Sequence, residues 1–538
     1  MTILDSHIDV AGDLFRQNRD DMLAEIARFR EAEARLTARE EKARPKFAKR
    51  GQLLPRERIA LLLDPGTPFL ELFSLAGYRR HDDRDGSEAG GGVISGIGYV
   101  SGVRCMVMAS NSAVKGGAIS PAGLQKNLRC QQIALENRLP LVFLVESAGA
   151  NLTYQSEVFI EGGRGFANQA RLSAAGIPQI TIVHGSSTAG GAYIPGLSDY
   201  VIMVRKAAKV FLAGPPLLRA ATGEIATDED LGGADMHGRE AGTAEFLAED
   251  DRDAVRIARD VVAGLGWPKA DGTPRFEESR PPRYAIEELV GVVPIDFKRS
   301  YDVREVIARI VDDSRFTEFK EAYEHFTICG RAEIQGRVCG LIGNNGPITT
   351  KGAVKAAQFI QLCCQSGTPL VYLQNTTGYM VGTEAERGGI VKHGSKMIQA
   401  VANATVPQIT LVIGGSFGAG NYGMCGRGMD PRFIFSWPNA RVGVMGAEQA
   451  AKVMSIITAA KAKRGGLPMP PQHLEAMERQ IIARMREESD VMFGSARLWD
   501  DGIIDPRDSR KVLAFLLSIC AESESRPLHA NSFGVARM

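Results

Sequence analysis

The sequence repeats itself at long range, and this repeat restricts the possible fold more than any other feature. The segment PLVFLVESAGANL begins at Pro140, and PLVYLQNTTGYMV begins at Pro369. The segments IPQITIVHGSSTAGGAY and VPQITLVIGGSFGAGNY place their prolines at 178 and 407, so both pairs are 229 residues apart. A repeat of this length indicates a duplicated domain, because solenoid repeats are only about 20–50 residues long. We therefore expect two copies of one fold.

The pattern inside each copy predicts an α/β protein. From residue 60 onward, short apolar runs alternate with longer amphipathic stretches, as in stacked β-α units. The length of 538 residues agrees with two cores, because a single core stops growing near about 250–300 residues. The polar, proline-rich segment 271–283 separates the copies, and 463–489 reads as a surface excursion that ends in a charged helix.

These boundaries predict a charged helical segment at 1–50, an N-half at 51–275, a C-half at 284–525 and a tail at 526–538. The helix in the first segment is expected over 12–44 and is expected to stop at Pro45.

Charge and composition exclude several classes of protein. The net charge of +1 argues against nucleic acid as a partner. No run of about 18 apolar residues predicts a membrane span, and the N-terminus does not resemble a signal peptide. We therefore expect a cytoplasmic enzyme with no membrane partner. The eight cysteines form no CxxC pair and no zinc-site spacing, so we expect buried reduced thiols and no metal.

Glycine-bearing loops follow the repeated strands and are the candidate chemical sites. The first strand of each half runs into Gly149 and Ala150, or into Gly378; the second runs into Gly190 and Gly191, or into Gly418 and Ala419. A helix N-terminus leaves backbone N–H groups unpaired, and two such groups that converge form an oxyanion hole. The glycines would also suit tight turns alone, but their repetition in both halves favours the anion sites.

The sequence has no ATP-binding loop of the GxxxxGK[ST] type. The segment GIGYVSG at 96–102 misses the GxGxxG spacing of a dinucleotide site. Glu146 and Glu448 lie near the loops, but neither belongs to an evident acid-base pair. The sequence therefore favours a site that works through backbone dipoles, with the base supplied by a bound group.

Several segments closely resemble the β subunits of methylcrotonyl-CoA and geranyl-CoA carboxylases, over about residues 20–538. They are GQLLPRERIALLLDPGTPFLEL, KGGAISP, STAGGAY, FLAGPPLLRAATGE, SFGAGNYGM and SARLWDDGIIDP. The resemblance implies two tandem crotonase-like domains of the ClpP/crotonase superfamily, each a β-β-α superhelix. It also implies a β hexamer inside a dodecameric complex, with a separate α subunit that carries biotin carboxylase and the biotin. The match nearest to the family's Ala-Met-Lys-Met acceptor has Glu478 in place of lysine.

The resemblance also implies roles for the loops. The N-half amides would hold the oxygen of an acyl-CoA thioester, and the C-half amides would hold the ureido oxygen of carboxybiotin. The expected biotin contacts are Thr377, Tyr379, Phe417, Gly420 and Asn421; the expected substrate contacts are Lys115, Gly116, Gly117, Ala192, Leu212 and Ala213. Lys115 would meet CoA phosphates, although a solvated surface lysine fits the sequence equally well.

The segment EVFIEGGRGFANQA bears on the size of the acyl group. The resemblance implies that methylcrotonyl-CoA carboxylases carry about three more residues and aromatic side chains here. The small residues Gly162, Gly163, Gly165 and Ala167 in a shortened loop would therefore leave room for a longer acyl tail. Each additional buried methylene favours the longer substrate by about 0.8 kcal/mol. We therefore expect geranyl-CoA as the substrate, in the catabolism of citronellol and geraniol. The alternative is 3-methylcrotonyl-CoA, from leucine catabolism.

Three more remote readings stay open. A crotonase-type hydratase would need paired glutamates that the sequence does not offer. A carboxyltransferase of a biotin-dependent decarboxylase would run the transfer in reverse. A scaffold subunit would not need either pair of glycine loops.

Overall fold

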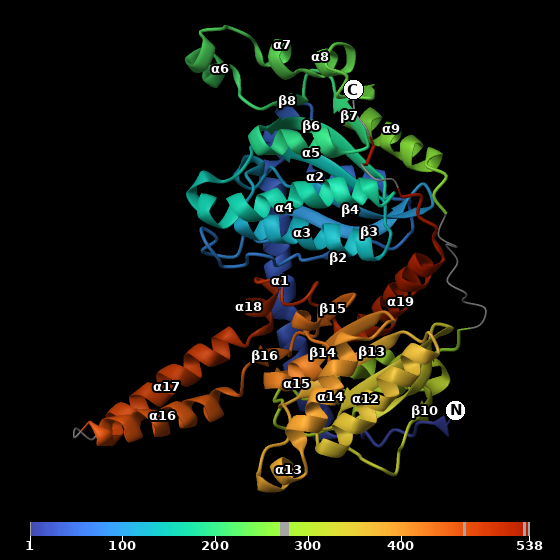
Figure 1. Cartoon of the computed structure of the whole chain (residues 1–538), viewed down its shortest axis with the longest axis vertical. Coiled ribbons are helices and arrows are strands. Elements are labelled where there is room, and N and C mark those ends of the chain that lie inside the picture. The colour runs from blue at the N-terminus through green and yellow to red at the C-terminus, as the bar shows by residue number, and fades with distance from the viewer. Residues whose placement is uncertain (1, 269–278, 466–469, 531–533, 536–538) are drawn as a thin grey trace. The chain divides into compact units, whose positions relative to one another are not determined.

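The computed structural model describes residues 2–268, 279–465, 470–530 and 534–535. It divides into two compact units, which we treat separately (Figure 1). The N unit comprises residues 31–272, 496–498 and 519–538, and the C unit comprises residues 1–30, 273–495 and 499–518. Most of the expected linker at 271–283 lies outside the described residues, as do 466–469 of the expected excursion and parts of the tail.

The N unit is built on an eight-stranded sheet. Its order is β2-β3-β4-β5-β6-β7-β9, and β8 also pairs with β6. Strands β2 to β4 are antiparallel neighbours, whereas β4 to β7 are parallel. The strands are β2 (Leu70–Leu72), β3 (Val93–Val100), β4 (Val103–Ser110), β5 (Leu141–Ser147), β6 (Gln179–Thr188), β7 (Tyr200–Val204), β8 (Lys209–Phe211) and β9 (Phe246–Ala248).

Helices cover both faces of this sheet. Ile59 of α2 and Ala254 of α9 pack with Val142 and Ile182 of the central strands in one buried apolar cluster. Helices α3 and α4 pack side by side and lie in front of the sheet in Figure 1. The helices are α2 (Pro55–Leu62), α3 (Pro121–Glu136), α4 (Gln155–Ala174), α5 (Tyr193–Leu197), α6 (Pro215–Thr222), α7 (Asp228–Gly232), α8 (Ala234–Arg239) and α9 (Asp251–Gly264), with 3₁₀ turns η1 (Lys115–Gly117), η2 (Leu152–Tyr154) and η3 (Ala189–Ala192).

The C unit repeats this sheet. Its order is β1-β10-β11-β12-β13-β14-β15, and β16 also pairs with β14. The strands are β1 (Thr2–Ile3), β10 (Arg315–Glu318), β11 (Thr327–Ile334), β12 (Arg337–Asn344), β13 (Leu370–Thr376), β14 (Gln408–Phe417), β15 (Phe433–Ser436) and β16 (Arg441–Gly443). From β10 to β16 the connections match those from β2 to β8, so the predicted duplication is confirmed.

Helices α12 and α14 pack on the C unit's sheet, where Ala356 and Met397 join Ile342 and Tyr372 in one apolar cluster. Helices α16 and α17 form a hairpin of two helices side by side (Figure 1), as expected for the excursion at 463–489. The helices are α10 (Leu289–Val292), α11 (Val303–Ile310), α12 (Thr350–Gln365), α13 (Thr383–Arg387), α14 (Ile390–Ala402), α15 (Gly418–Gly423), α16 (Ala447–Arg464), α17 (Pro471–Glu488), α18 (Val491–Ser495) and α19 (Ser509–Ser525), with 3₁₀ turns η4 (Ile286–Glu288), η5 (Asp312–Ser314), η6 (Arg427–Met429) and η7 (Pro506–Asp508).

The duplication extends to a capping carboxylate at the first hairpin of each sheet. Asp64 accepts hydrogen bonds from the backbone N–H groups of Ser101 and Gly102, at 2.9 and 2.7 Å. Asp312 accepts the corresponding pair from Gln335 and Gly336, both at 2.8 Å. A carboxylate that holds two amides fixes a tight turn whose N–H groups have no partner in the strand ladder.

The long N-terminal helix α1 (Asp13–Lys49) corrects one prediction, because it continues through Pro45 instead of stopping there. Proline removes one helical hydrogen bond. The turn beyond it is held by tertiary packing, since the Phe47 ring is buried. The helix ends near Gly51, which has a left-handed φ of 69°.

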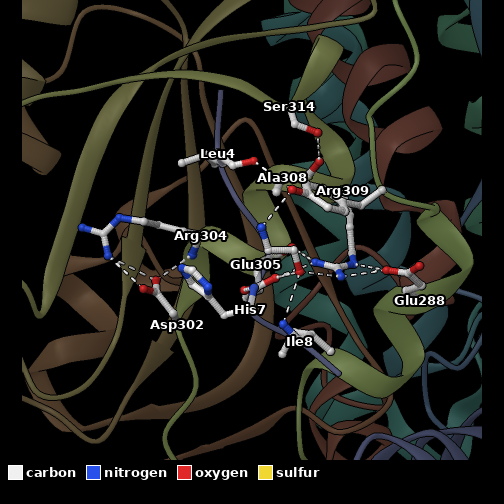
Figure 2. A network of polar contacts seen from close by, with 12 residues as sticks. Leu4, His7, Ile8, Glu288, Asp302, Arg304, Glu305, Ala308, Arg309 and Ser314 are labelled. Carbon is white, nitrogen blue, oxygen red and sulfur yellow. Dashed lines mark hydrogen bonds and ion pairs between the residues drawn. The ribbon is translucent and has the colours of Figure 1, made fainter. Parts of the chain in front are cut away.

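The chain's N-terminus is anchored in the C unit. Strand β1 pairs antiparallel with β10, and the Ser6 hydroxyl donates to Glu305 at 2.6 Å. The Arg309 side chain, 1% exposed, bridges Glu305 and Glu288 at 2.8 and 2.7 Å. Figure 2 shows these groups converging beside the N-terminal segment. The buried arginine therefore ties α11 to the start of the chain and to η4.

All eight cysteines are free, and seven of them are buried. Burial raises the pKa of the Cys425 thiol to about 12. This agrees with the expected buried, reduced thiols. Within the described part of the chain, no helix is long and apolar enough to cross a membrane, and no group of three potential ligand side chains is placed to hold a metal ion.

Candidate active site

The candidate site of each unit begins at an irregularity between its two central parallel strands. In the N unit, Val145 pairs with Val183, but the next pairing is Ser147 with Ser187. One residue of β5 thus faces three residues of β6. In the C unit, the pairing moves from Gln374–Val412 to Thr376–Ser416 in the same way. A β-bulge bends a strand and re-aims the chain that follows, so both units direct their glycine loops by the same device.

The first loop is held by a short parallel bridge. In the N unit, Ile119 donates to the carbonyl of Gly149 at 2.8 Å and accepts from Asn151 at 3.0 Å. In the C unit, Ile348 bonds to Gly378 and Met380 at 2.9 and 2.8 Å. The glycines have φ values of 81° and 122°, which L side chains rarely adopt.

The predicted donor Gly149 already has a nearby acceptor. Its N–H lies 3.2 Å from Ser147 Oγ, and the Gly378 N–H lies 3.2 Å from Thr376 Oγ1. These long bonds hold the loop against the end of its own strand. The predicted Ala150 follows directly and forms the parallel bridge with Ile119.

The second loop turns from a strand directly into a helical turn. Ala189 opens η3 with a φ of 52°, and Gly418 opens α15 with a φ of 56°. A residue with a left-handed backbone conformation thus opens the second loop at the same position in both units. The first N–H groups of a helical turn have no acceptor inside the helix. The predicted donors Gly190, Gly191 and Ala419 occupy these positions.

The two loops of each unit lie in direct contact. A Cβ on Gly149 would lie 3.3 Å from the carbonyl oxygen of Thr188, and one on Gly378 would lie 3.5 Å from that of Phe417. A Cβ on Gly191 would lie 2.8 Å from Ser147 Oγ. The positive φ of Gly149 and Gly378, together with the tight space at Gly191, favours glycine at these positions. The structure therefore brings together the loops that the sequence singled out within each half.

Beside these loops, the two units differ in open volume. The N unit has a cavity of about 40 Å³ lined by Gly92, Ser120 and Tyr154. The matching place in the C unit, lined by Phe326, Thr349 and residues 380–385, opens to about 670 Å³. In the N unit, residues 80–83 also line the cavity. The duplicated frame thus has different room for ligands in its two copies.

The expected biotin contacts fall into two groups. Thr377 is exposed beside the loop, and Gly420 is so close that its Cβ would lie 2.8 Å from the Cα of Gly378. The other three side chains are tied into the protein. Tyr379 donates to the carbonyl of Gly394 at 3.2 Å, Asn421 donates to Ser416 Oγ at 2.6 Å, and the Phe417 ring packs 4.8 Å from that of Phe297. These three hold the loop in shape.

The expected CoA contact Lys115 is already paired. Its ammonium lies 2.7 Å from Asp82 and 3.3 Å from Glu88. Gly116 and Gly117 follow it in η1, and a Cβ on Gly117 would lie 2.3 Å from the carbonyl oxygen of Glu146. The glycines therefore let this turn pack against the end of β5.

The segment expected to be a shortened loop is helical, and that prediction is wrong. Gly162, Gly163, Gly165 and Ala167 all lie inside α4. Each interior glycine weakens a helix by about 1 kcal/mol, but burial of Val158 and Leu172 on one face holds it together. Figure 1 shows α4 beside α3 in front of the sheet.

The face of α4 still approaches the second loop. Phe166 lies 5.5 Å from the ring of Tyr193, centroid to centroid, and a Cβ on Gly190 would lie 3.9 Å from the Phe166 ring. A Cβ on Gly162 or Gly163 would meet nothing within 4 Å. Ala192, the last residue of η3, is buried. Leu212, which directly follows β8, is 58% exposed and precedes Ala213.

The two carboxylates near the loops are engaged in ion pairs. Glu448 pairs with Arg486 and with Lys298, and hydrogen bonding to Arg486 lowers its pKa to about 2. Glu146 lies 3.3 Å from the buried guanidinium of Arg58. Neither group is placed as a free base. The sequence did not point to Arg58, Asp251 or His184, which form a buried charged cluster behind the N unit's loops.

Comparison with known proteins decides the family. The model of the carboxyl transferase domain matches residues 46–534. The chain belongs to the carboxyl transferase family. This carboxyltransferase is 47% identical over 540 residues to the methylcrotonoyl-CoA carboxylase beta chain, mitochondrial, of Dictyostelium discoideum, covering 100% of this chain and 91% of that protein. It is 48% identical over 501 residues to the biotin-dependent 3-methylcrotonyl-coenzyme A carboxylase beta1 subunit of Mycobacterium tuberculosis, covering 93% of each.

A solved structure matches the carboxyltransferase over its full length. The β subunit of geranyl-CoA carboxylase from P. aeruginosa is 61% identical, with a TM-score of 0.93 and 100% coverage of both chains. The expected crotonase-like fold is thereby confirmed. The chain is the carboxyltransferase β subunit of a biotin-dependent acyl-CoA carboxylase.

Proposed function

We propose that this carboxyltransferase acts on geranyl-CoA and transfers a carboxyl group to the γ carbon of its 3-methyl-2-enoyl group. The observation that carries the proposal is the 61% identity, over the whole chain, to a geranyl-CoA carboxylase β subunit. The methylcrotonyl-CoA carboxylase chains reach 47% and 48%. The open face of α4 at Gly162 and Gly163 supports room for a longer acyl chain beside the second loop.

In this proposal the N unit binds the acyl thioester. Removal of a γ proton from a 3-methyl-2-enoyl thioester spreads negative charge onto the thioester oxygen. The amides at Ala150, Gly190 and Gly191 donate hydrogen bonds to that oxygen, and such donors accelerate a reaction when they bind the charge that develops in the transition state. The bulge between the paired strands β5 and β6 supports this role, because it directs the two loops of the N unit toward each other.

The C unit holds the biotin of a partner subunit. When bound, carboxybiotin would supply the carboxyl group as CO₂ and a ring nitrogen that could take up the γ proton of the substrate. The residues of the C unit fit a planar ring with an exposed carbonyl: Gly378 and Gly420 bring two backbones together without side chains. Beside them lies the cavity of about 670 Å³. The amides of Gly418 and Ala419 would orient the ureido oxygen, and Thr377, exposed in the first loop, is available to contact the ring.

The remaining parts of the proposal concern partners. We propose an α subunit with biotin carboxylase and biotin carrier domains, and a hexamer of β subunits in a dodecameric complex. Growth on acyclic terpenoids such as citronellol and geraniol would then require this chain. The second candidate substrate is 3-methylcrotonyl-CoA, which the names of the curated relatives favour.

The test is ATP- and bicarbonate-dependent carboxylation by the reconstituted complex of this chain with its α subunit. We expect kcat/KM for geranyl-CoA to exceed that for 3-methylcrotonyl-CoA at least tenfold. Equal values, or a preference for the shorter substrate, would exclude geranyl-CoA as the main substrate.

A paired substitution tests the part played by α4. Gly162→Phe fills the open face of the helix on the side that carries Phe166, since these positions are four residues apart. We expect it to lower kcat/KM for geranyl-CoA and to spare 3-methylcrotonyl-CoA. Arg164→Phe adds the same ring at a 65% exposed position of the same helix, and we expect it to change neither value.

A further inference from the structure

Four charged or titratable side chains form a buried cluster directly behind the loops of the N unit. The Arg58 Nε lies 2.9 Å from Asp251 Oδ2, and one terminal nitrogen lies 3.3 Å from Glu146 Oε2. His184 Nδ1 donates to Asp251 Oδ1 at 2.7 Å. Their exposed fractions are 1% for Arg58, 6% for Glu146, 0% for His184 and 3% for Asp251.

The cluster joins the bulge to the helices behind it. Glu146 is the residue of β5 that lies opposite the three unpaired residues of β6, of which His184 is the first. Asp251 is the first residue of α9, and Arg58 lies in α2. A Cβ on Gly185, within the bulge, would lie 2.9 Å from the Glu146 carboxylate. Both sides of the bulge are therefore held from behind by charged groups on separate helices.

The segment before α2 adds two further bonds. The Gln52 side chain donates to the carbonyl of His184 at 2.7 Å, and the Leu53 N–H donates to Asp251 at 2.8 Å. This segment belongs to the GQLLPRERI stretch, whose role the glycine loops do not explain. The GQLLPRERI stretch thus supplies Gln52, Leu53 and Arg58 to one cluster.

The C unit has the same bulge, but uncharged side chains stand at the positions of Glu146 and His184. Asn375 stands at the position of Glu146, and its amide oxygen accepts from the Gly415 N–H at 2.9 Å. Ile413 stands at the position of His184 and is fully buried. The Asn439 side chain also donates to the carbonyl of Ile413 at 3.1 Å. Neutral hydrogen bonds thus hold this bulge, so the shared fold does not require the ionic cluster.

The cluster also contains unsatisfied groups. One terminal nitrogen of Arg58 and the Nε2 of His184 have no hydrogen-bond partner among the described residues. A buried polar atom without a partner lowers stability, and an apolar core often replaces a buried ion pair without loss. Stability alone therefore gives little reason for this arrangement beside the loops.

We infer that Arg58, Glu146, His184 and Asp251 are positioning residues that hold the β5–β6 bulge of the N unit and thereby set the distance between its two loops. The cluster reaches the loops through the neighbours of its own members. Glu146 precedes Ser147, whose hydroxyl contacts Gly149, and His184 lies three residues before Ser187, whose hydroxyl donates to the carbonyl of Gly191 at 2.9 Å.

Asp251 and His184 keep the same charge over the pH range in which an enzyme is assayed. Burial opposes the charge of Asp251, but the bond from His184 and the charge of Arg58 lower its pKa to about 2. Burial and Arg58 lower the pKa of His184 below its usual 6.5. The cluster is thus a fixed support, and we expect no change in the pH profile of the reaction.

The experiment compares buried Asp251 with the partly buried Asp64 of the same unit. Asp251→Asn removes the charge that holds Arg58 and His184. Asp64→Asn is the matched control, because Asp64 binds two backbone amides and Arg259 at the Ser101–Gly102 hairpin, away from the loops. Glu146→Gln is a milder third variant in case Asp251→Asn does not fold.

We expect kcat of the full complex to fall about 100-fold in Asp251→Asn and in Glu146→Gln, as for a displacement of about 1 Å at a site. KM for acyl-CoA should change by less than threefold, because most of a CoA ester is bound away from the reacting atoms. Asp64→Asn should lower the melting temperature and leave kcat unchanged. A wild-type kcat in both Asp251→Asn and Glu146→Gln would overturn the inference.

Hydrogen exchange of the β subunit separates this inference from the proposed function, on which its kinetic part rests. Amides of residues 185–191 should exchange faster in Asp251→Asn than in Asp64→Asn, whatever the substrate. If the wild-type complex carboxylates neither acyl-CoA, the proposed substrates are wrong, and exchange alone decides on the cluster. Unchanged exchange at 185–191 would show that the cluster does not hold the bulge.

Discussion

The contact between the two loops of the C unit allows a demanding test with a single methyl group. Gly420 is the third residue of α15 and lies against the first loop. A Cβ there would lie 2.8 Å from the Cα of Gly378 and 3.0 Å from Thr376 Cγ2. The nearer atom is backbone, so no side chain can rotate away. Gly420→Ala must therefore push the loops apart.

The size of the effect follows from the distances. Carbon atoms in contact are about 3.5–4.0 Å apart, so the loops must separate by about 0.7 Å or more. Displacing a catalytic group by about 1 Å lowers the rate about 100-fold, which corresponds to about 2.7 kcal/mol in the barrier. Overpacking itself lowers stability by about 1–3 kcal/mol. We expect a folded β subunit with a melting temperature a few degrees lower and a kcat about 1% of normal.

The assay is carboxylation by the reconstituted complex, with thermal unfolding of the β subunit measured in parallel. Gly428→Ala is the matched control, because Gly428 lies in the same unit and a Cβ there meets nothing within 4 Å. We expect this control to keep full activity. If Gly420→Ala folds and retains a normal kcat, the close approach of the loops is not needed for transfer, and the reasoning from backbone donors fails.

Three further predictions concern stability, pH and the CoA site. Arg309→Met should lower the free energy of unfolding by about 3 kcal/mol, because it leaves the buried Glu305 carboxylate without its ion-pair partner. The control is Arg484→Met, since Arg484 is 77% exposed in its ion pair with Glu488. It should change the free energy of unfolding by less than about 0.5 kcal/mol in the same denaturant titration. Burial raises the pKa of Asp500 from 3.8 to about 6. The folded state therefore binds more protons than the unfolded state between these two pH values, and the free energy of unfolding should fall as the pH rises from about 4 to about 6. Asp500→Asn should remove this pH dependence, and a dependence that persists in the variant would assign it to another group. Lys115→Met should change KM for acyl-CoA by less than twofold, because Asp82 and Glu88 already neutralise the Lys115 ammonium. A tenfold rise in KM would instead show that Lys115 contacts the CoA phosphates, as the sequence suggested.

The sequence predicted the duplication, the fold class and the positions of the glycine loops. These features depend only on the order of residues along the chain. A strand–loop pattern that repeats at a constant offset can be recognised without knowing what packs against it. The equivalence of Asp64 and Asp312 was not found, because it lies upstream of the aligned segments at a different offset. A carboxylate that caps a hairpin has no characteristic neighbours in the sequence.

The two incorrect structural predictions have a common cause. Pro45 and the glycines of α4 are local signals against a helix, each worth about 1–3 kcal/mol. In the folded chain, Phe47 and Val158 are buried on the faces of those helices, and their packing outweighs the local preference. Propensity is a property of a few neighbouring residues, whereas burial depends on what the rest of the chain places there.

The sequence by itself therefore determined that two copies of one α/β fold would each carry a pair of close-packed glycine loops. Only the tertiary structure decided how those loops are held. Arg58, Glu146, His184 and Asp251 come from four elements spread over nearly 200 residues, and nothing in their local sequence relates them to one another. Their association depends on the sheet and two helices meeting behind one bulge. Long-range charge pairing of this kind exists only after the chain has folded.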